Sequence, residues 1–172
     1  MSLIVVDVEA DGPIPGVYSM VSFGAVVVDE KLDKTFYGQV KPISGKWIPD
    51  ALAVSGVSRE EHLAFDEPAS VMLAFDKWIK ETAKGRAVFV SDNLAFDWQW
   101  INYYFHFYMG KNPFGFSGQR IGDKFQGFFN DPYYSWKKHR RTKHTHNPVD
   151  DAKGNAEALL YLKEQGFKLK LD

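Results

Sequence analysis

The sequence contains no cysteine, which excludes disulfides, thiolate zinc sites and cysteine nucleophiles. This absence fits a reducing compartment, and we expect a cytoplasmic protein. No apolar run approaches the roughly 18 residues that span a membrane, and we expect neither a signal peptide nor a membrane segment. The net charge of −1 provides no global basic field toward nucleic acid, so charge has to be considered segment by segment.

The chain has 172 residues, of which 45% are hydrophobic and 25% charged, as in an ordinary globular protein. This length supports one domain with a sizeable core, so we expect residues 1–172 to form a single domain. No repeat, low-complexity tract or linker divides it.

Strand-like and helix-like patterns alternate along the chain. We expect strands over 3–9, 20–29, 34–41 and 86–91, and helices over 51–54, 68–83, 94–109 and 148–165. Short turns join the first three strands, which predicts an antiparallel meander. Residues 110–136 are the least regular, although 120–125 suits a short helix or strand. The alternation indicates an α/β fold.

The first strand leads from an apolar run into two acids, Asp7 and Glu9. The apolar run is typical of a strand at the centre of a sheet. Side chains alternate along a strand, so these two carboxylates project to the same side. Their repulsion is tolerable if a cation lies between them. Alone, the pair is more typical of a strand that ends in a solvated acidic turn.

Two further motifs fall at helix starts. Asn93-Leu94-Ala95-Phe96-Asp97 places an acid in the first turn after the fourth strand, and His146-Asn147-Pro148-Val149-Asp150-Asp151 opens the last helix. In that order, Asp-x-Glu, Asn-x-x-x-Asp and His-x-x-x-x-Asp resemble the DEDDh 3′–5′ exonucleases of the ribonuclease H-like superfamily. The resemblance spans nearly the whole chain. It implies a ribonuclease H-like mixed five-stranded sheet with the antiparallel N-terminal meander, flanked by helices.

The resemblance also implies a site chemistry. Asp7, Glu9, Asp97 and Asp151 would hold two divalent metal ions, Mg²⁺ or Mn²⁺, which prefer such oxygen ligands. Asp7 would bridge the ions, and His146 would be the general base, because histidine has an unperturbed pKa of about 6.5. The family spacing favours Asp151 over its neighbour Asp150, whose alternative role is a helix-terminus charge.

The chain departs from the family pattern at two positions. Ala10-Asp11-Gly12 follows the first motif where Thr-Gly is common in the family, and Asp92 stands where His is common; neither Asp11 nor Asp92 is assigned as a ligand. His144 has the wrong spacing to Asp151, so we expect it to be solvated. The remaining histidines are expected to have no catalytic role: His62, His106 and His139.

Five permanent positive charges precede the final motif: Lys137, Lys138, Arg140, Arg141 and Lys143. They favour contact with a nucleic-acid backbone, the alternative being a solvated loop. Aromatic residues crowd 96–108, which favours core packing or a homodimer face over base stacking. Stacking residues would instead come from Phe23 or from 110–136.

The function that fits these features is hydrolysis of single-stranded nucleic acid from its 3′ end to nucleoside 5′-monophosphates. The short chain resembles RNA-trimming family members slightly more than DNA-specific ones. Two alternatives stay open: a DNA proofreading or repair exonuclease, and a weakly active nucleic-acid-binding module on the same fold.

Overall fold

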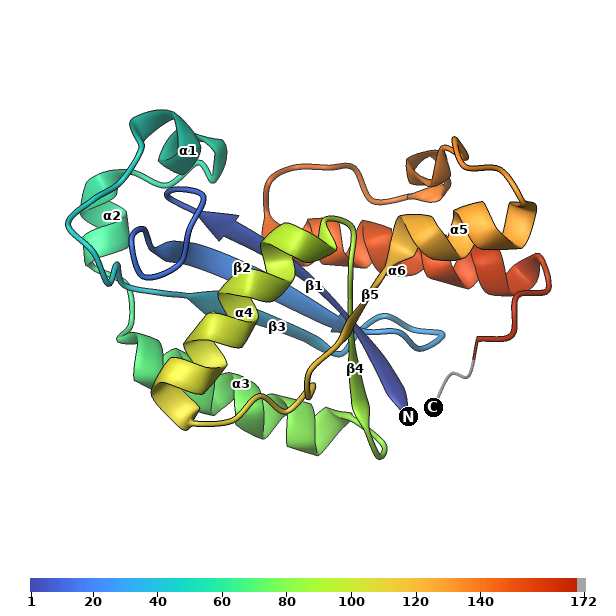
Figure 1. Cartoon of the computed structure of the whole chain (residues 1–172), viewed down its shortest axis with the longest axis horizontal. Helices are drawn as coiled ribbons and strands as arrows, with labels where there is room; N and C mark the ends of the chain where they lie inside the picture. Colours follow the sequence, from blue (N-terminus) through green and yellow to red (C-terminus); the bar gives the residue numbers. More distant parts are fainter. Residues whose placement is uncertain (170–172) are drawn as a thin grey trace.

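A five-stranded mixed sheet forms the centre of the computed structural model, which describes residues 1–169 (Figure 1). The strands, in chain order, are β1 Ser2–Ala10, β2 Met20–Val27, β3 Thr35–Gln39, β4 Ala87–Ser91 and β5 Gly118–Arg120. Their spatial order is β3-β2-β1-β4-β5; β1, β2 and β3 pair antiparallel, and β4 pairs parallel with both β1 and β5. The predicted α/β class, mixed sheet and antiparallel meander are confirmed.

Helices cover both faces of this sheet. They are α1 Pro49–Val54, α2 Arg59–Leu63, α3 Pro68–Thr82, α4 Leu94–Met109, α5 Ile121–Phe129, α6 Pro148–Glu164 and a 3₁₀ helix, η1, Trp136–His139. Residues 120–125, predicted as either a helix or a strand, contain both: β5 ends at Arg120 and α5 starts at Ile121. Ile121 and Phe125 are fully buried one turn apart, which holds α5 on the sheet despite its glycines. No helix within residues 1–169 is long and apolar enough to cross a membrane.

Two helices begin at capping side chains. The side chain of Asn147 accepts hydrogen bonds from the backbone N–H groups of Val149 and Asp150, at 3.0 and 3.4 Å, which satisfies two donors at the start of α6. At α2, the Ser58 hydroxyl accepts from the Glu61 N–H at 3.2 Å, and the Glu61 carboxylate accepts from the Ser58 N–H at 2.8 Å. These caps fix where the chain enters each helix.

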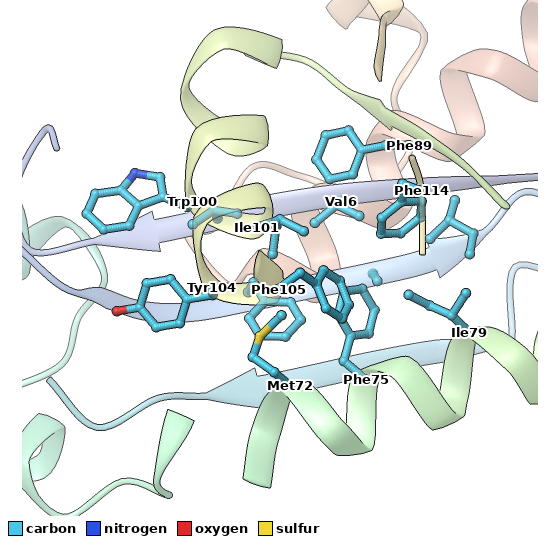
Figure 2. Packing of buried hydrophobic residues seen from close by; sticks show 14 of the residues in the cluster. Val6, Met72, Phe75, Ile79, Phe89, Trp100, Ile101, Tyr104, Phe105 and Phe114 are labelled. Carbon is cyan, nitrogen blue, oxygen red and sulfur yellow. The ribbon is translucent and has the colours of Figure 1, made fainter. Parts of the chain in front are cut away.

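Side-chain alternation along β1 divides the core between the two faces of the sheet. Its even-numbered apolar residues pack with α3 and α4, and Figure 2 shows Val6 in one cluster with Phe75, Ile101 and Phe105. Its odd-numbered apolar residues, Leu3 and Val5, pack on the other face with α5 and α6. Asp7 and Glu9 continue the odd series, so β1 directs both carboxylates toward the α6 face.

The aromatic helix, α4, is mainly a core helix. Trp100, Tyr104 and Phe105 are fully buried, which confirms the expectation of core packing, while Phe107 is exposed and the homodimer face stays a prediction. Phe23 is also fully buried, with its ring 4.8 Å from that of Phe75. Of the two sources of base-stacking residues left open by the sequence, Phe23 is therefore wrong, because β2 turns its ring into the core beneath α3.

Candidate active site

Three carboxylates meet at the end of β1. Asp7 and Glu9 come from this strand and Asp151 from the first turn of α6; one oxygen from each lies within 4.8 Å of the other two. Asp151 is fully buried, whereas Asp7 and Glu9 are partly exposed at the surface of the site. The structure therefore brings together three of the four acids that the motifs singled out.

A glycine on the neighbouring strand allows α6 to approach this closely. Gly24 lies opposite Asp7 in the β1–β2 pair. A Cβ atom at Gly24 would lie 2.3 Å from the carbonyl group of Pro148, the first residue of α6. The missing side chain thus lets the N-terminal end of α6 rest on the sheet beside Asp7, which carries Asp151 into the site.

The fourth acid, Asp97, reaches the site from α4. Because β1 and β4 are parallel, their carboxyl ends lie at one edge of the sheet, and α4 begins there. Asp97 Oδ1 accepts a hydrogen bond from the backbone N–H of Val8 at 3.2 Å. Its Oδ2 is buried and has no hydrogen-bond partner within residues 1–169. A buried carboxylate oxygen without a protein partner is available to a bound ligand.

Asp151 is the most extensively contacted acid. Its Oδ2 accepts a hydrogen bond from the His146 N–H at 3.0 Å, and its Oδ1 accepts one from the Thr145 N–H at 3.3 Å. Arg140 Nη2 donates to the Asp151 backbone carbonyl at 2.9 Å and to Oδ1 at 3.4 Å. Asp150 instead accepts from the Thr145 hydroxyl at 3.2 Å, outside the carboxylate cluster of the described chain. This agrees with the preference for Asp151.

His146 lies on an exposed loop at the mouth of the site. Its Nδ1 is 3.6 Å from Glu9 Oε1, and its backbone has φ of 60°. A left-handed conformation in a residue other than glycine is strained by about 1–3 kcal/mol and persists only when the surrounding structure holds it. The turn directs the imidazole toward Glu9 while its N–H faces Asp151.

The same turn brings in His144, which the sequence reasoning expected to be solvated. Its side chain is half exposed, but Nδ1 lies 2.8 Å from Asp151 Oδ1, so that expectation is wrong in part. His144, His146 and Asp151 form a second group with ligand atoms within 4.8 Å of one another. Spacing along the sequence gave no sign of this contact, because it depends on the reversal of the chain at His146.

Mutual repulsion and burial perturb the carboxyl groups. Burial, followed by the charges of Asp97 and Asp151, raises the pKa of Asp7 well above its ordinary value. Burial, with Asp151 adding to the effect, raises the pKa of Glu9 to about 7. Burial raises that of Asp97 to about 8. Buried acids with raised pKa values are typical of a site completed by cations, and this all-oxygen set suits Mg²⁺ or Mn²⁺.

The basic residues divide into two groups. Arg140 is almost fully buried against Asp151, so it belongs to the acid cluster and does not offer an exposed backbone contact. The others have exposed side chains beside the site: Lys137, Lys138, Arg141 and Lys143. With Arg140, Thr142 and His144, three of these line a groove of about 340 Å³. Lys137 Nζ pairs with Asp92 Oδ2 at 2.7 Å, which gives that unassigned acid a role at the edge of the groove.

Glu9 also lines an apolar cavity of about 410 Å³. It is lined by Glu9, Ala10, Gly12, Pro13, Ile48, Ala51, Val54 and Phe96. The cavity was not predicted, because α1 lies about forty residues from β1 in the sequence and nothing local indicates their contact.

The other histidines lie outside the two groups of candidate ligands within residues 1–169. His62 is buried, with Nε2 3.3 Å from the Met20 carbonyl oxygen. His139 stacks on Tyr161 at 3.7 Å between ring centroids. His106 is exposed. Their lack of a catalytic role stays a prediction.

Comparison with known proteins identifies the family. No protein-family model matches the sequence. A curated Escherichia coli protein, 3′-5′ DNA exonuclease Cap18, is 39% identical over 180 residues, covering 97% of this chain and 94% of that protein. The chain belongs to the DEDDh family of 3′–5′ exonucleases. These enzymes are hydrolases of the ribonuclease H-like superfamily and generally use divalent metal ions.

Solved structures of exonucleases share the fold. The nuclease domain of 3′hExo, a DEDDh family member bound to rAMP, superposes with a TM-score of 0.81 at 18% identity, covering 99% of this chain and 96% of that one. The zinc-bound E. coli ExoI–ssDNA complex gives 0.73 at 15% identity, covering 97% of this chain and 41% of that one. At such identities these matches concern the fold alone.

Proposed function

We propose that this protein is a metal-dependent 3′–5′ exonuclease that hydrolyses single-stranded DNA to nucleoside 5′-monophosphates. The observation that carries the proposal is the cluster of Asp7, Glu9 and Asp151 oxygens within 4.8 Å, beside His146 and next to an apolar cavity. The carboxylates of this cluster repel one another, and bound cations would offset that repulsion.

Asp7, Glu9, Asp97 and Asp151 would hold two Mg²⁺ or Mn²⁺ ions. The raised pKa values of Asp7, Glu9 and Asp97 and the unpartnered Oδ2 of Asp97 support this fit, because both features describe carboxylates without their counter-charge. When bound, such ions lower the pKa of a water, neutralise the phosphate and support the leaving oxygen.

The histidine and the cavity supply the rest of the mechanism. The exposed imidazole of His146 accepts the proton of the attacking water, and its position beside Glu9 places it next to the cluster. Asp151 holds the loop through the His146 N–H. The cavity of about 410 Å³ accommodates the 3′-terminal nucleoside, with Phe96 and Ile48 as apolar walls for the base.

The exposed cations form the path of the remaining strand. Lys137, Arg141 and Lys143 line the groove beside the acid cluster, where they contact phosphates. Arg140 serves another purpose: its bonds to the carbonyl and carboxylate of Asp151 hold that acid in position.

The choice of DNA over RNA rests on the curated relative. The sequence alone slightly favoured RNA, but the relative at 39% identity over nearly the full length is a DNA exonuclease. Among the solved structures, one is bound to rAMP and another to single-stranded DNA, both below 20% identity, so they favour neither.

A strand-shortening assay tests this proposal. DNA and RNA strands of one sequence, labelled at the 5′ end, are incubated with Mg²⁺, Mn²⁺ or EDTA. We expect a ladder that shortens from the 3′ end only with metal, faster on DNA, with nucleoside 5′-monophosphates as products. Faster RNA shortening would overturn the substrate assignment. Binding of strands without shortening would instead favour the binding-module alternative.

A further inference from the structure

Asp11 is a fully buried acid that the proposed chemistry does not use. It directly follows β1, but its carboxylate does not belong to the acid cluster at the end of that strand. Oδ1 accepts a hydrogen bond from the Ser19 N–H at 2.5 Å, and Oδ2 accepts one from Arg59 Nη1 at 3.0 Å. Burial raises the pKa of Asp11, and the Arg59 charge opposes that shift. Because the Asp11 carboxylate is buried, loss of Arg59 would leave its charge without a cationic partner.

Arg59 extends this connection through several groups. Its Nη2 donates to the Ser44 carbonyl at 3.1 Å, and its guanidinium lies 5.4 Å from the centre of the Trp47 ring. Nη1 also lies 3.3 Å from Nδ1 of His62, which is fully buried. Burial lowers the pKa of His62, so the neutral imidazole accepts from Arg59 through Nδ1 and donates to the Met20 carbonyl through Nε2.

These contacts join residues that precede and follow α1 in the sequence. α1 itself forms one wall of the apolar cavity. Ile48, Ala51 and Val54 line the cavity together with Glu9, and α1 lies near the end of β1 in Figure 1. α1 has only six residues, and Leu52 is its one buried side chain. So short a helix is not stable by itself and takes its position from its contacts.

Asp11 contacts the chain both before and after α1. Its backbone carbonyl accepts a hydrogen bond from the Ile48 N–H at 2.8 Å, directly before α1. Its carboxylate binds Arg59, the first residue of α2, directly after the connection from α1. One residue of the β1–β2 connection thus fixes the start of α1 and the segment that follows it.

We propose that the Asp11–Arg59 ion pair is a positioning device that holds α1 as the wall of the 3′-terminal nucleotide pocket and thereby sets the affinity for the strand end. This inference rests on the proposed function, because it takes the cavity to be the nucleotide site. Arg59 touches no reacting atom, so it acts on substrate binding and not on the hydrolytic step.

The test compares Arg59→Met and Arg59→Lys with Lys80→Met, whose ammonium pairs with Asp76 on α3, away from the cavity. KM and kcat are measured on single-stranded DNA, together with the inhibition constant of dAMP, which fills the pocket alone. If loss of the ion pair leaves α1 in place in a tenth of the molecules, KM and the dAMP constant both rise about tenfold in Arg59→Met. kcat stays near the wild-type value, and Lys80→Met matches wild type.

Arg59→Lys keeps the charge and gives a smaller increase, which also serves as the test if Arg59→Met does not fold. An active variant with unchanged KM and dAMP constant, or one whose kcat alone falls, would overturn the positioning role. A wild-type protein that shortens no strand would remove the proposed function and this inference with it, so the two failures are distinguishable.

Discussion

Raising the pH of the metal-free protein should destabilise it, because the active-site carboxyls ionise without a counter-charge. Glu9 has a pKa of about 7 and Asp97 of about 8 in the folded state, above their ordinary values of 4.5 and 3.8. Between the ordinary and the raised values the folded protein holds more protons than the unfolded one. The free energy of unfolding therefore falls as the pH rises through the folded-state values.

The size of this effect follows from the pKa values. The whole Glu9 difference corresponds to about 3 kcal/mol at about 1.4 kcal/mol per pH unit, most of it lost below pH 6.5. Between pH 6.5 and 8.5, Glu9 and Asp97 together lose about 3 kcal/mol, which solvent screening at the partly exposed Glu9 reduces to about 2 kcal/mol. In a domain of this size, that corresponds to a Tm lower by about 4–8 °C.

Urea unfolding in EDTA at pH 6.5, 7.5 and 8.5 measures this difference. Burial lowers the pKa of His62, so this residue makes the protein more stable as the pH rises toward the pKa of an unfolded histidine. The pH series begins at 6.5, where an unfolded histidine is half deprotonated, which limits this opposing effect. Asp97→Asn should flatten the profile, whereas Glu81→Gln, an exposed acid on α3, should not. Mg²⁺ should restore more stability at pH 8.5 than at 6.5, because cations bind the ionised carboxylates. Stability that is constant or rises with pH in EDTA would refute the reasoning.

Three further outcomes are expected. His146→Ala should lower turnover by about 10²–10⁴-fold while Mn²⁺ affinity, measured by titration calorimetry, stays unchanged; lost affinity would make the residue a ligand. Gly24→Ala should destabilise the protein by about 1–3 kcal/mol in urea and reduce turnover, because its Cβ would meet the α6 backbone, whereas Gly45→Ala, with open space around it, serves as control. Lys143→Ala should reduce the slope of log binding constant against log salt concentration for single-stranded DNA by about 0.7. An equal slope in Lys143→Ala and in the distant control Lys77→Ala would show that Lys143 does not contact the strand.

The motifs predicted the acid cluster because each acid lies next to a regular element. Period-two alternation along β1 directs Asp7 and Glu9 to one face, and the cap at Asn147 places Asp151 in the first turn of α6. The parallel pairing of β1 and β4, which brings Asp97 to the same edge, follows from the strand–helix order. These parts of the site depend on local patterns and simple topology.

The contacts that the sequence did not predict depend on loop paths. Arg140 and His144 both reach Asp151 because the chain reverses at His146 with a positive φ. Charge composition grouped Arg140 with its exposed neighbours, although its side chain is buried. The Asp11–Arg59 pair joins residues 48 positions apart. No periodicity encodes such contacts, since they are fixed by tertiary packing.

The most direct test of the account compares two adjacent acids on 5′-labelled single-stranded DNA with Mg²⁺. Asp151→Asn alters the buried member of the carboxylate cluster, and Asp150→Asn alters its neighbour in the same helical turn. We expect Asp150→Asn to shorten the strand from its 3′ end like wild type, and Asp151→Asn to leave it intact while remaining folded. A folded Asp151→Asn variant that degrades the strand at the wild-type rate would contradict the assignment of hydrolysis to this cluster.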